Sequence, residues 1–381
     1  KRVILTALSI GLMPVLGYGQ LPPLNAAEGT WMMHHGAASL RGLQRLKGAI
    51  TGPYVRCENF FATAEGDPLV ADINGDGLNE IVLAAWEHGR VYAFRGTDCS
   101  LLWSSPVISS SCCGSFSPAV GELDPTRPGL EIAVVVDYTD SLYVLSGTDG
   151  SIIWRARLGD VKLSPPTIAD IDGDGVGEIF VSSMFTTYAF RGNGTLLWSY
   201  SAGYRHSNVA VGDLDNDGTL EVVFFGYTNP PSPYRVFALR ATNGTLVWDY
   251  PISHHSNVAL ADLDNDGRLE VVVAHHGGVR VLRHNGTLYW SRSLVCNACV
   301  QANYRPNSPT IADLNGDGLR EILVACYVER TVYALRGTDG STLWSYGNVT
   351  TCSQNTSRKI GDIDGDGALE VVLTSYHSGY C

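Results

Sequence analysis

An acidic segment recurs along the chain at intervals of about 50 residues. Its clearest copy, Asp-Ile-Asp-Gly-Asp-Gly-Val-Gly-Glu, occupies 170–178. The successive copies begin at Asp72, Glu122, Asp170, Asp213, Asp262, Asp313 and Asp362, with spacings between 43 and 51 residues. A period of this length indicates a repeat architecture, in which every copy belongs to one structural unit of the same kind.

Each acidic segment is followed by the same succession of sequence patterns. In the third unit a β-branched run (EIFVSS) leads to an alternating run (TYAFRG), an Asn-Gly turn and the segment TLLWSY. Alternation, β-branched residues and glycine-bearing turns predict four short strands per unit. Six units carry a tryptophan at one position, where we expect packing between neighbouring units: Trp103, Trp154, Trp198, Trp248, Trp290 and Trp344.

Units of four strands at this period predict an all-β fold, a seven-bladed β-propeller over 67–381 with the acidic loop between the first and second strands of each blade. A strand-only solenoid is the alternative architecture. The seventh unit ends after ALEVVLTSYHSGYC and lacks its two outer strands. We expect 20–66 to connect and close the ring, through EGTWMM or GAITGPYV, unless a neighbouring subunit supplies the missing strand.

The spacing of oxygen-bearing residues in the acidic segment indicates calcium. Side-chain oxygens at positions 1, 3 and 5, a main-chain carbonyl at position 7 and a carboxylate at position 9 form an oxygen cage, and glycine at position 6 permits the sharp turn. Six copies keep this pattern. About six Ca²⁺ ions would neutralise the formal net charge of −12, so the acidity of the chain is explained by its metal sites.

The six segments resemble the FG-GAP or VCBS repeats of integrin α-subunit propellers, and the resemblance covers about 67–381. It implies calcium in a loop between the first and second strands of a blade. By position, the implied ligands of the first three such loops are Asp72, Asn74, Asp76, Leu78 and Glu80; Asp170, Asp172, Asp174, Val176 and Glu178; and Asp213, Asp215, Asp217, Thr219 and Glu221. Those of the other three are Asp262, Asp264, Asp266, Arg268 and Glu270; Asp313, Asn315, Asp317, Leu319 and Glu321; and Asp362, Asp364, Asp366, Ala368 and Glu370.

Two features depart from the integrin pattern. The segments end in Glu, whereas the integrin loops usually end in Asp. The second copy contains an extra residue together with Pro125, Arg127 and Pro128. We expect this second copy to bind no metal, with Arg127 supplying the positive charge instead.

The N-terminal sequence indicates export from the cytoplasm. Residues 1–19 combine a basic start, an apolar run and a small-residue end, which is typical of a secretory leader cleaved before Gln20. The alternative is a retained apolar arm that is donated to a neighbouring subunit. Nine cysteines then favour disulfides in a secreted or cell-surface protein. Candidate glycosylation sites are Asn193, Asn243, Asn285, Asn348 and Asn355.

The sequence contains no recognisable catalytic motif. Its one suggestive cluster is His206, His255 and His275, which we expect near the mouth of the ring, where three imidazoles can bind zinc or copper. We expect a non-enzymatic structural or adhesive protein, as the repeating subunit of an extracellular filament or as a partner of an extracellular protein or glycan. The alternative is a polysaccharide-active enzyme or carbohydrate-binding module. Nucleic-acid binding and an integral membrane span are not expected.

Overall fold

The fold is seen in a computed structural model. The structure describes residues 3–6, 43–47, 68–85, 88–109, 117–136, 139–159, 164–203, 208–227, 234–252, 256–275, 278–294, 309–326, 331–347, 358–362 and 369–374. Across these residues the regular secondary structure is β-strand, and the strands form seven four-stranded sheets.

Six of the sheets are built from consecutive antiparallel strands. The first three comprise β3 (Leu69–Ala71), β4 (Glu80–Ala85), β5 (Arg90–Arg95) and β6 (Leu101–Ser104); β7 (Ala119–Gly121), β8 (Glu131–Val136), β9 (Ser141–Ser146) and β10 (Ile152–Arg157); and β11 (Thr167–Ala169), β12 (Glu178–Ser182), β13 (Thr186–Phe190) and β14 (Leu196–Ser201). The next three comprise β15 (Ala210–Gly212), β16 (Glu221–Tyr227), β17 (Tyr234–Arg240) and β18 (Leu246–Ile252); β19 (Ser256–Ala261), β20 (Glu270–His275), β21 (Gly278–Leu282) and β22 (Leu288–Ser293); and β23 (Thr310–Ala312), β24 (Glu321–Cys326), β25 (Thr331–Arg336) and β26 (Thr342–Tyr346).

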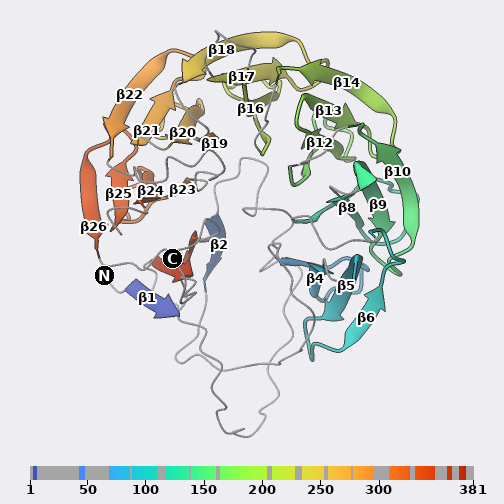
Figure 1. Ribbon diagram of the computed structural model, residues 1–381. Helices are drawn as coiled ribbons and strands as arrows, with labels where there is room; N and C mark the ends of the chain where they lie inside the picture. Colours follow the sequence, from blue (N-terminus) through green and yellow to red (C-terminus); the bar gives the residue numbers. More distant parts are fainter. Residues whose placement is uncertain are drawn as a thin grey trace, which may run out of the picture.

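The sheets are arranged around a ring, with β6, β10, β14, β18, β22 and β26 at its circumference (Figure 1). The first strands of neighbouring sheets contact one another in sequence order, from β3 and β7 through to β23. In the six sheets built from consecutive strands, the second and third strands carry most of the buried side chains, such as the fully buried Phe180 and Phe224. The predicted propeller, with four strands per repeat, is therefore confirmed.

The seventh sheet joins distant parts of the chain. Its order is β1 (Val3–Thr6), β28 (Glu370–Thr374), β27 (Arg358–Asp362) and β2 (Leu43–Lys47). β27 and β28 are antiparallel, as in the other blades, whereas β1 pairs with β28 and β2 pairs with β27 in parallel. The stretches EGTWMM and GAITGPYV, which we expected to close the ring, lie outside the described residues.

Tryptophans of the outer strands link each blade to the next. The indole Nε1 of Trp103 donates to the carbonyl of Gly147 at 2.7 Å. Gly150, in the same turn as Gly147, packs against the indole of Trp103. A Cβ added at Gly150 would lie 2.4 Å from the indole, so only glycine permits this approach. The same indole-to-carbonyl bond, at 2.7 or 2.8 Å, joins Trp154 to Gly192, Trp198 to Ala241, Trp248 to His284 and Trp290 to Gly337. The expected packing of these tryptophans between units is confirmed for these five.

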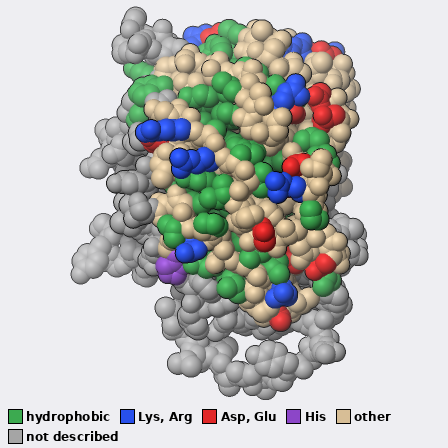
Figure 2. Space-filling view, turned by 90° about the vertical axis from the view of Figure 1, so that its right-hand side faces the viewer, with side chains coloured by type: hydrophobic (Ala, Val, Ile, Leu, Met, Phe, Trp, Pro, Cys, Tyr) green, Lys and Arg blue, Asp and Glu red, His purple; other side chains and the backbone are tan. Residues whose placement is uncertain are grey.

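The outer wall of the ring mixes apolar, basic and acidic side chains, as seen on the face formed around β6, β10 and β14 (Figure 2). The first residue of five outer strands is an aliphatic side chain left more than 40% exposed: Leu101, Ile152, Leu196, Leu246 and Leu288. No helix within the described residues has the length and apolar character needed to cross a membrane.

Candidate metal-binding loops

Five acidic loops adopt one backbone conformation. Each follows the first strand of its blade and ends where the second strand begins. Glycine at position 6 has a φ between +86° and +87° in all five, at Gly77, Gly175, Gly218, Gly267 and Gly318. Position 4 is also left-handed, with Gly or Asn. These are the residue types that adopt positive φ at little cost, so the sequence pattern and the turn explain one another.

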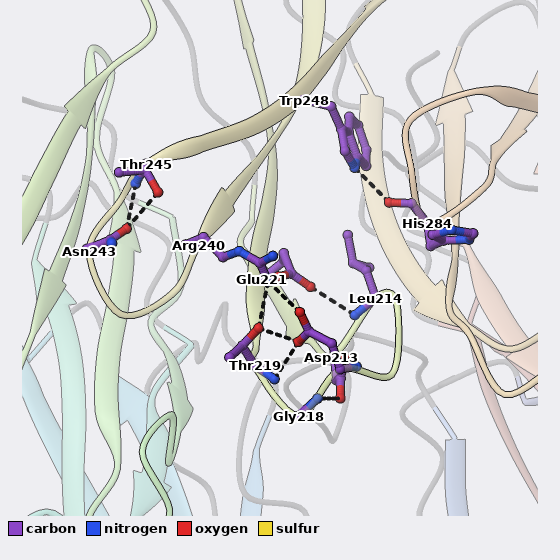
Figure 3. A network of polar contacts seen from close by, with 11 residues as sticks. Asp213, Leu214, Gly218, Thr219, Glu221, Arg240, Asn243, Thr245, Trp248 and His284 are labelled. Carbon is purple, nitrogen blue, oxygen red and sulfur yellow. Dashed lines mark hydrogen bonds and ion pairs between the residues drawn. The ribbon is translucent and has the colours of Figure 1, made fainter.

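The same hydrogen bonds hold each of these loops. In the fourth loop the amide of Gly218 donates to Asp213 Oδ2 at 2.9 Å, and the amide of Thr219 donates to Asp217 Oδ1 at 2.8 Å. The amide of Leu214, at position 2, donates to Glu221 Oε2 at 3.0 Å (Figure 3). Equivalent bonds occur in the other four loops. In each loop, the carboxylates at positions 1, 5 and 9 therefore each use an oxygen to accept a main-chain amide hydrogen bond, and these bonds fix the loop conformation.

The glutamate at position 9 is buried in every described blade. Burial is the main cause that raises the pKa of Glu80 and of Glu270 to about 7, and the amide hydrogen bonds from Ile73 and Leu263 oppose that rise. Burial also raises the pKa of Glu178, Glu221 and Glu321. Neighbouring aspartates raise these pKa values further by repulsion. A cation in the loop would offset both the cost of burying the ionised glutamate and its repulsion from the aspartates.

Three loops bring carboxylates close enough to share an ion. Oxygens of Asp170, Asp172 and Glu178 lie within 4.8 Å of one another, as do those of the corresponding residues in the fourth and fifth loops, Asp213, Asp215 and Glu221, and Asp262, Asp264 and Glu270. Asp215 Oδ1 and Asp262 Oδ1 are shielded from solvent and accept no hydrogen bond from the described residues. Such orphaned oxygens, within a set of hard oxygen donors, fit calcium.

The first and sixth loops place an asparagine at position 3. Asn74 Nδ2 donates to Asp76 Oδ2 at 3.1 Å, and Asn315 Nδ2 donates to Asp317 Oδ2 at 2.9 Å. In the sixth loop the amide nitrogen also lies 3.4 Å from Glu321 Oε1, and so takes a place between two carboxylates that a cation would occupy. Binding of calcium there requires the amide to present its oxygen instead.

The second loop has a different arrangement. Arg127 Nε forms a 3.0 Å ion pair with Asp124 Oδ2, inside the loop. Glu131 still accepts hydrogen bonds from the amides of Leu123 and Asp124, at 2.9 and 3.0 Å. Glu131, which corresponds to the position-9 glutamate, thus orients this loop even though Thr126 stands where the intact loops have the position-5 aspartate.

Neighbouring loops are joined through their main chains. The amide of Leu130 in the second loop donates to the carbonyl of Ile73 in the first, at 3.0 Å. The amide of Gly177 likewise donates to Glu122 O at 2.7 Å. These bonds connect the first three loops in series.

Some of the predicted site residues fall outside the described part of the chain. In the seventh loop, Asp364, Asp366 and Ala368 are not described, and Glu370 begins β28. His206 and His255 are also outside it, whereas His275 ends β20. Of the candidate glycosylation sites, Asn348 and Asn355 are not described; Asn193, Asn243 and Asn285 are exposed in turns, where each Oδ1 accepts a hydrogen bond from the amide two residues on.

An arginine lies opposite the position-9 glutamate, and our sequence reasoning did not identify it. The strand register pairs Glu80 with Arg95 and Glu221 with Arg240. Glu321 faces Arg336 in the same way. In the second blade, whose loop is degenerate, Ser146 takes this place opposite Glu131. The repeated arginine of AFRG and ALRG was the available signal, because it recurs at a fixed distance from the acidic segment.

The centre of the ring offers little polar chemistry among the described residues. The first strands of the six complete blades, β3, β7, β11, β15, β19 and β23, contain no charged residue and no histidine. A small-molecule cofactor needs a few well-placed polar groups to fix its orientation. These six strands do not by themselves supply such a set.

The structure defines a β-propeller whose blades are linked by tryptophans and carry acidic loops. A family model described as "Outer membrane protein assembly factor BamB" matches residues 87–346 and 235–381, and the chain belongs to this family, PQQ_2. No curated protein matches the sequence.

Solved structures share this fold at low sequence identity. BamB from Moraxella catarrhalis has a TM-score of 0.51 and 13% identity, with 81% of this chain and 84% of that chain covered. A quinohemoprotein alcohol dehydrogenase from Pseudomonas putida HK5 has a TM-score of 0.55 and 13% identity, with coverage of 91% and 62%. A europium-containing methanol dehydrogenase has a TM-score of 0.53 and 13% identity, with coverage of 87% and 82%.

The resemblance to FG-GAP or VCBS integrin propellers was therefore wrong. It rested on the acidic loops alone, and a short cation-binding loop can occur on unrelated repeats. The family match instead covers a continuous run of strands, turns and tryptophans. Because assembly factors and dehydrogenases both occur among these relatives, membership of the family does not decide whether this chain is an enzyme.

Proposed function

We propose that this chain is a calcium-stabilised, non-catalytic propeller that acts by presenting its surface to a partner. The observation that supports this most strongly is the repetition of one loop conformation, with converging carboxylates in three blades. An energetically costly cluster of acidic groups is maintained around the ring, as expected if each loop is completed by a cation. Calcium would then tie the first and second strands of each blade together.

Removal of metal tests this function. Protein purified in calcium should contain one ion per intact loop and should lose thermal stability in excess EDTA, because an ion that binds the folded state stabilises it. Calcium should restore the melting temperature. Magnesium should restore it poorly, since it prefers a smaller octahedral shell. A metal-free preparation whose melting temperature is indifferent to both EDTA and calcium would contradict the proposal.

We place the protein outside the cytoplasm. Millimolar extracellular calcium suits loops that are exposed and only partly pre-formed. Cys99 and Cys326 each take part in a disulfide bond. Disulfides persist mainly in oxidising compartments. Treatment of native protein with a glycosidase, followed by mass spectrometry, would show whether the exposed Asn193, Asn243 or Asn285 carries a glycan. Recovery of the fully reduced protein from a cytoplasmic fraction would argue against this location.

A second candidate role, as the subunit of a filament, is favoured by the seventh sheet. β1 adds to the edge of β28 by parallel main-chain pairing, from Val3–Val371 to Thr6–Thr374. The same pairing made between chains would link copies head to tail. Light scattering and electron microscopy should show assemblies for the full chain and monomers after deletion of residues 1–19. A native N-terminus at Gln20 would exclude the arm from such contacts.

A further inference from the structure

The guanidinium of Arg240 enters the fourth acidic loop. Its Nη1 forms an ion pair with Glu221 Oε1 and donates to Thr219 Oγ1 at 2.6 Å (Figure 3). The same nitrogen lies 3.4 Å from Asp217 Oδ2. The loop positions 5, 7 and 9 are thus bridged by one cationic side chain. The Glu221 side chain is only 2% exposed, so water screens this pair weakly.

The corresponding arginines of three other blades make different contacts. Arg95 Nη1 donates to Ser100 Oγ at 3.2 Å, and Arg336 Nη1 donates to Ser341 Oγ at 3.1 Å. These serines lie in the turn after the third strand. In the fifth blade, Arg283 stacks over the ring of Tyr289, 4.2 Å from its centroid.

One local difference favours the inward turn of Arg240. The fourth loop has a hydroxyl at position 7, Thr219, whereas the first and sixth loops have leucine there. The matching turn residue, Thr245, donates its hydroxyl to Asn243 Oδ1 at 2.8 Å, much as the Ser100 hydroxyl bonds Asp98, so the turn does not set the fourth blade apart. Thr219 gives Arg240 an acceptor inside the loop that the first and sixth loops lack.

We propose that Arg240 is a tethered cation that competes with calcium for the fourth loop, so that this loop fills at a higher free calcium concentration than the fifth. The inference rests on the proposed calcium function and concerns the order in which the loops fill. Calcium must displace an ion pair from Glu221 and Asp217 in the fourth blade, whereas Arg283 of the fifth blade is held on Tyr289. In the calcium-free protein, Arg240 neutralises part of the carboxylate repulsion.

Calcium titration of the full chain tests this competition. Bound calcium per chain is measured against free calcium by native mass spectrometry and flow dialysis, for the wild type, Arg240→Gln and the matched control Arg283→Gln. In Arg240→Gln the binding step of the fourth loop, which is the step that Asp215→Asn removes, should move to lower free calcium by about tenfold, within the usual range of coupling between two ligands. The total number of ions should stay the same, and Arg283→Gln should follow the wild type.

Two further measurements assign the effect to this loop. Adding Asp215→Asn to Arg240→Gln should remove the shifted step. In EDTA, Arg240→Gln should melt below Arg283→Gln, because Glu221 and Asp217 lose their counter-charge. If Arg240→Gln does not fold without calcium, Thr219→Val, which removes one anchor of the arginine, should give a smaller shift in the same direction.

The outcomes separate the two proposals. A calcium-binding protein in which Arg240→Gln leaves the binding step of the fourth loop unchanged, or moves it to higher calcium, overturns the competition alone. A protein that binds no calcium in any variant overturns the proposed function and the competition with it.

Discussion

Trp198 Nε1 donates a 2.7 Å hydrogen bond to the main-chain carbonyl of Ala241, from the outer strand of one blade to a turn of the next. Both residues are buried. Trp198→Phe should therefore lower the free energy of unfolding by about 1–3 kcal/mol, because it leaves a buried carbonyl without its donor. Urea denaturation checks this value. Leu196→Ala, two residues away on an exposed position, is the control and should change stability much less.

The glycine beneath the same indole gives a second test. A Cβ at Gly244 would lie 2.7 Å from Trp198 Cδ2, and its φ is +70°. Gly159 has a similar φ of +75° but faces open space. Gly159→Ala should cost about 1–2 kcal/mol from backbone strain. Gly244→Ala should cost a further ~1–3 kcal/mol from overpacking. Equal losses in the two variants would mean that the indole moves aside freely.

Substitution within one intact loop should remove one ion. Asp264→Asn weakens the fifth cage, so calcium content should fall by one ion per chain and the melting temperature in calcium should fall with it. In EDTA the variant and the wild type should differ little. Asp124→Asn in the second loop is the matched control and should leave calcium content unchanged. Loss of an ion from that control would show that the Arg127 loop binds metal.

Glu131 predicts a distinctive pH dependence, in a loop where we expect no metal. Burial raises its pKa above the ordinary 4.5, so the folded protein binds this proton more tightly than the unfolded chain. The stabilising contribution is present below pH 4.5 and is lost as the pH rises through the folded value. Glu131→Gln keeps an acceptor for Leu123 and Asp124 but cannot ionise. The stability of the wild type relative to this variant should therefore fall with rising pH.

The exposed carboxylate of Asp98 should change stability with pH in the direction opposite to Glu131. The Ser100 hydroxyl and amide lower the pKa of Asp98, so its contribution is present at neutral pH and is lost as the pH falls. Urea unfolding of Glu131→Gln and Asp98→Asn across the acidic range checks both directions. Parallel pH profiles for the two variants would contradict this interpretation.

Much of the fold could be predicted from the sequence because each local pattern recurs. The period, the alternating runs and the glycine turns predicted the blades, and the placement of Trp103 and its equivalents predicted contacts between them. The family was mistaken because the acidic loop was given more weight than the strands around it. The position of Arg240 could not be read from the sequence, since ALRA resembles ALRG elsewhere and the acceptor Thr219 comes close to Arg240 only in the folded blade.

The seventh sheet constrains the order in which the molecule can be completed. Each of the other blades uses one continuous stretch of chain, so it can form as soon as that stretch leaves the ribosome. The seventh needs Val3–Thr6 and Leu43–Lys47 together with Arg358–Asp362 and Glu370–Thr374. Pairing across such a separation is slow, because a long loop must close before any contact forms. The two N-terminal strands therefore stay without their partner strands through most of translation. Pairing with the wrong exposed sheet edge during this time is the main hazard in the biogenesis of this ring.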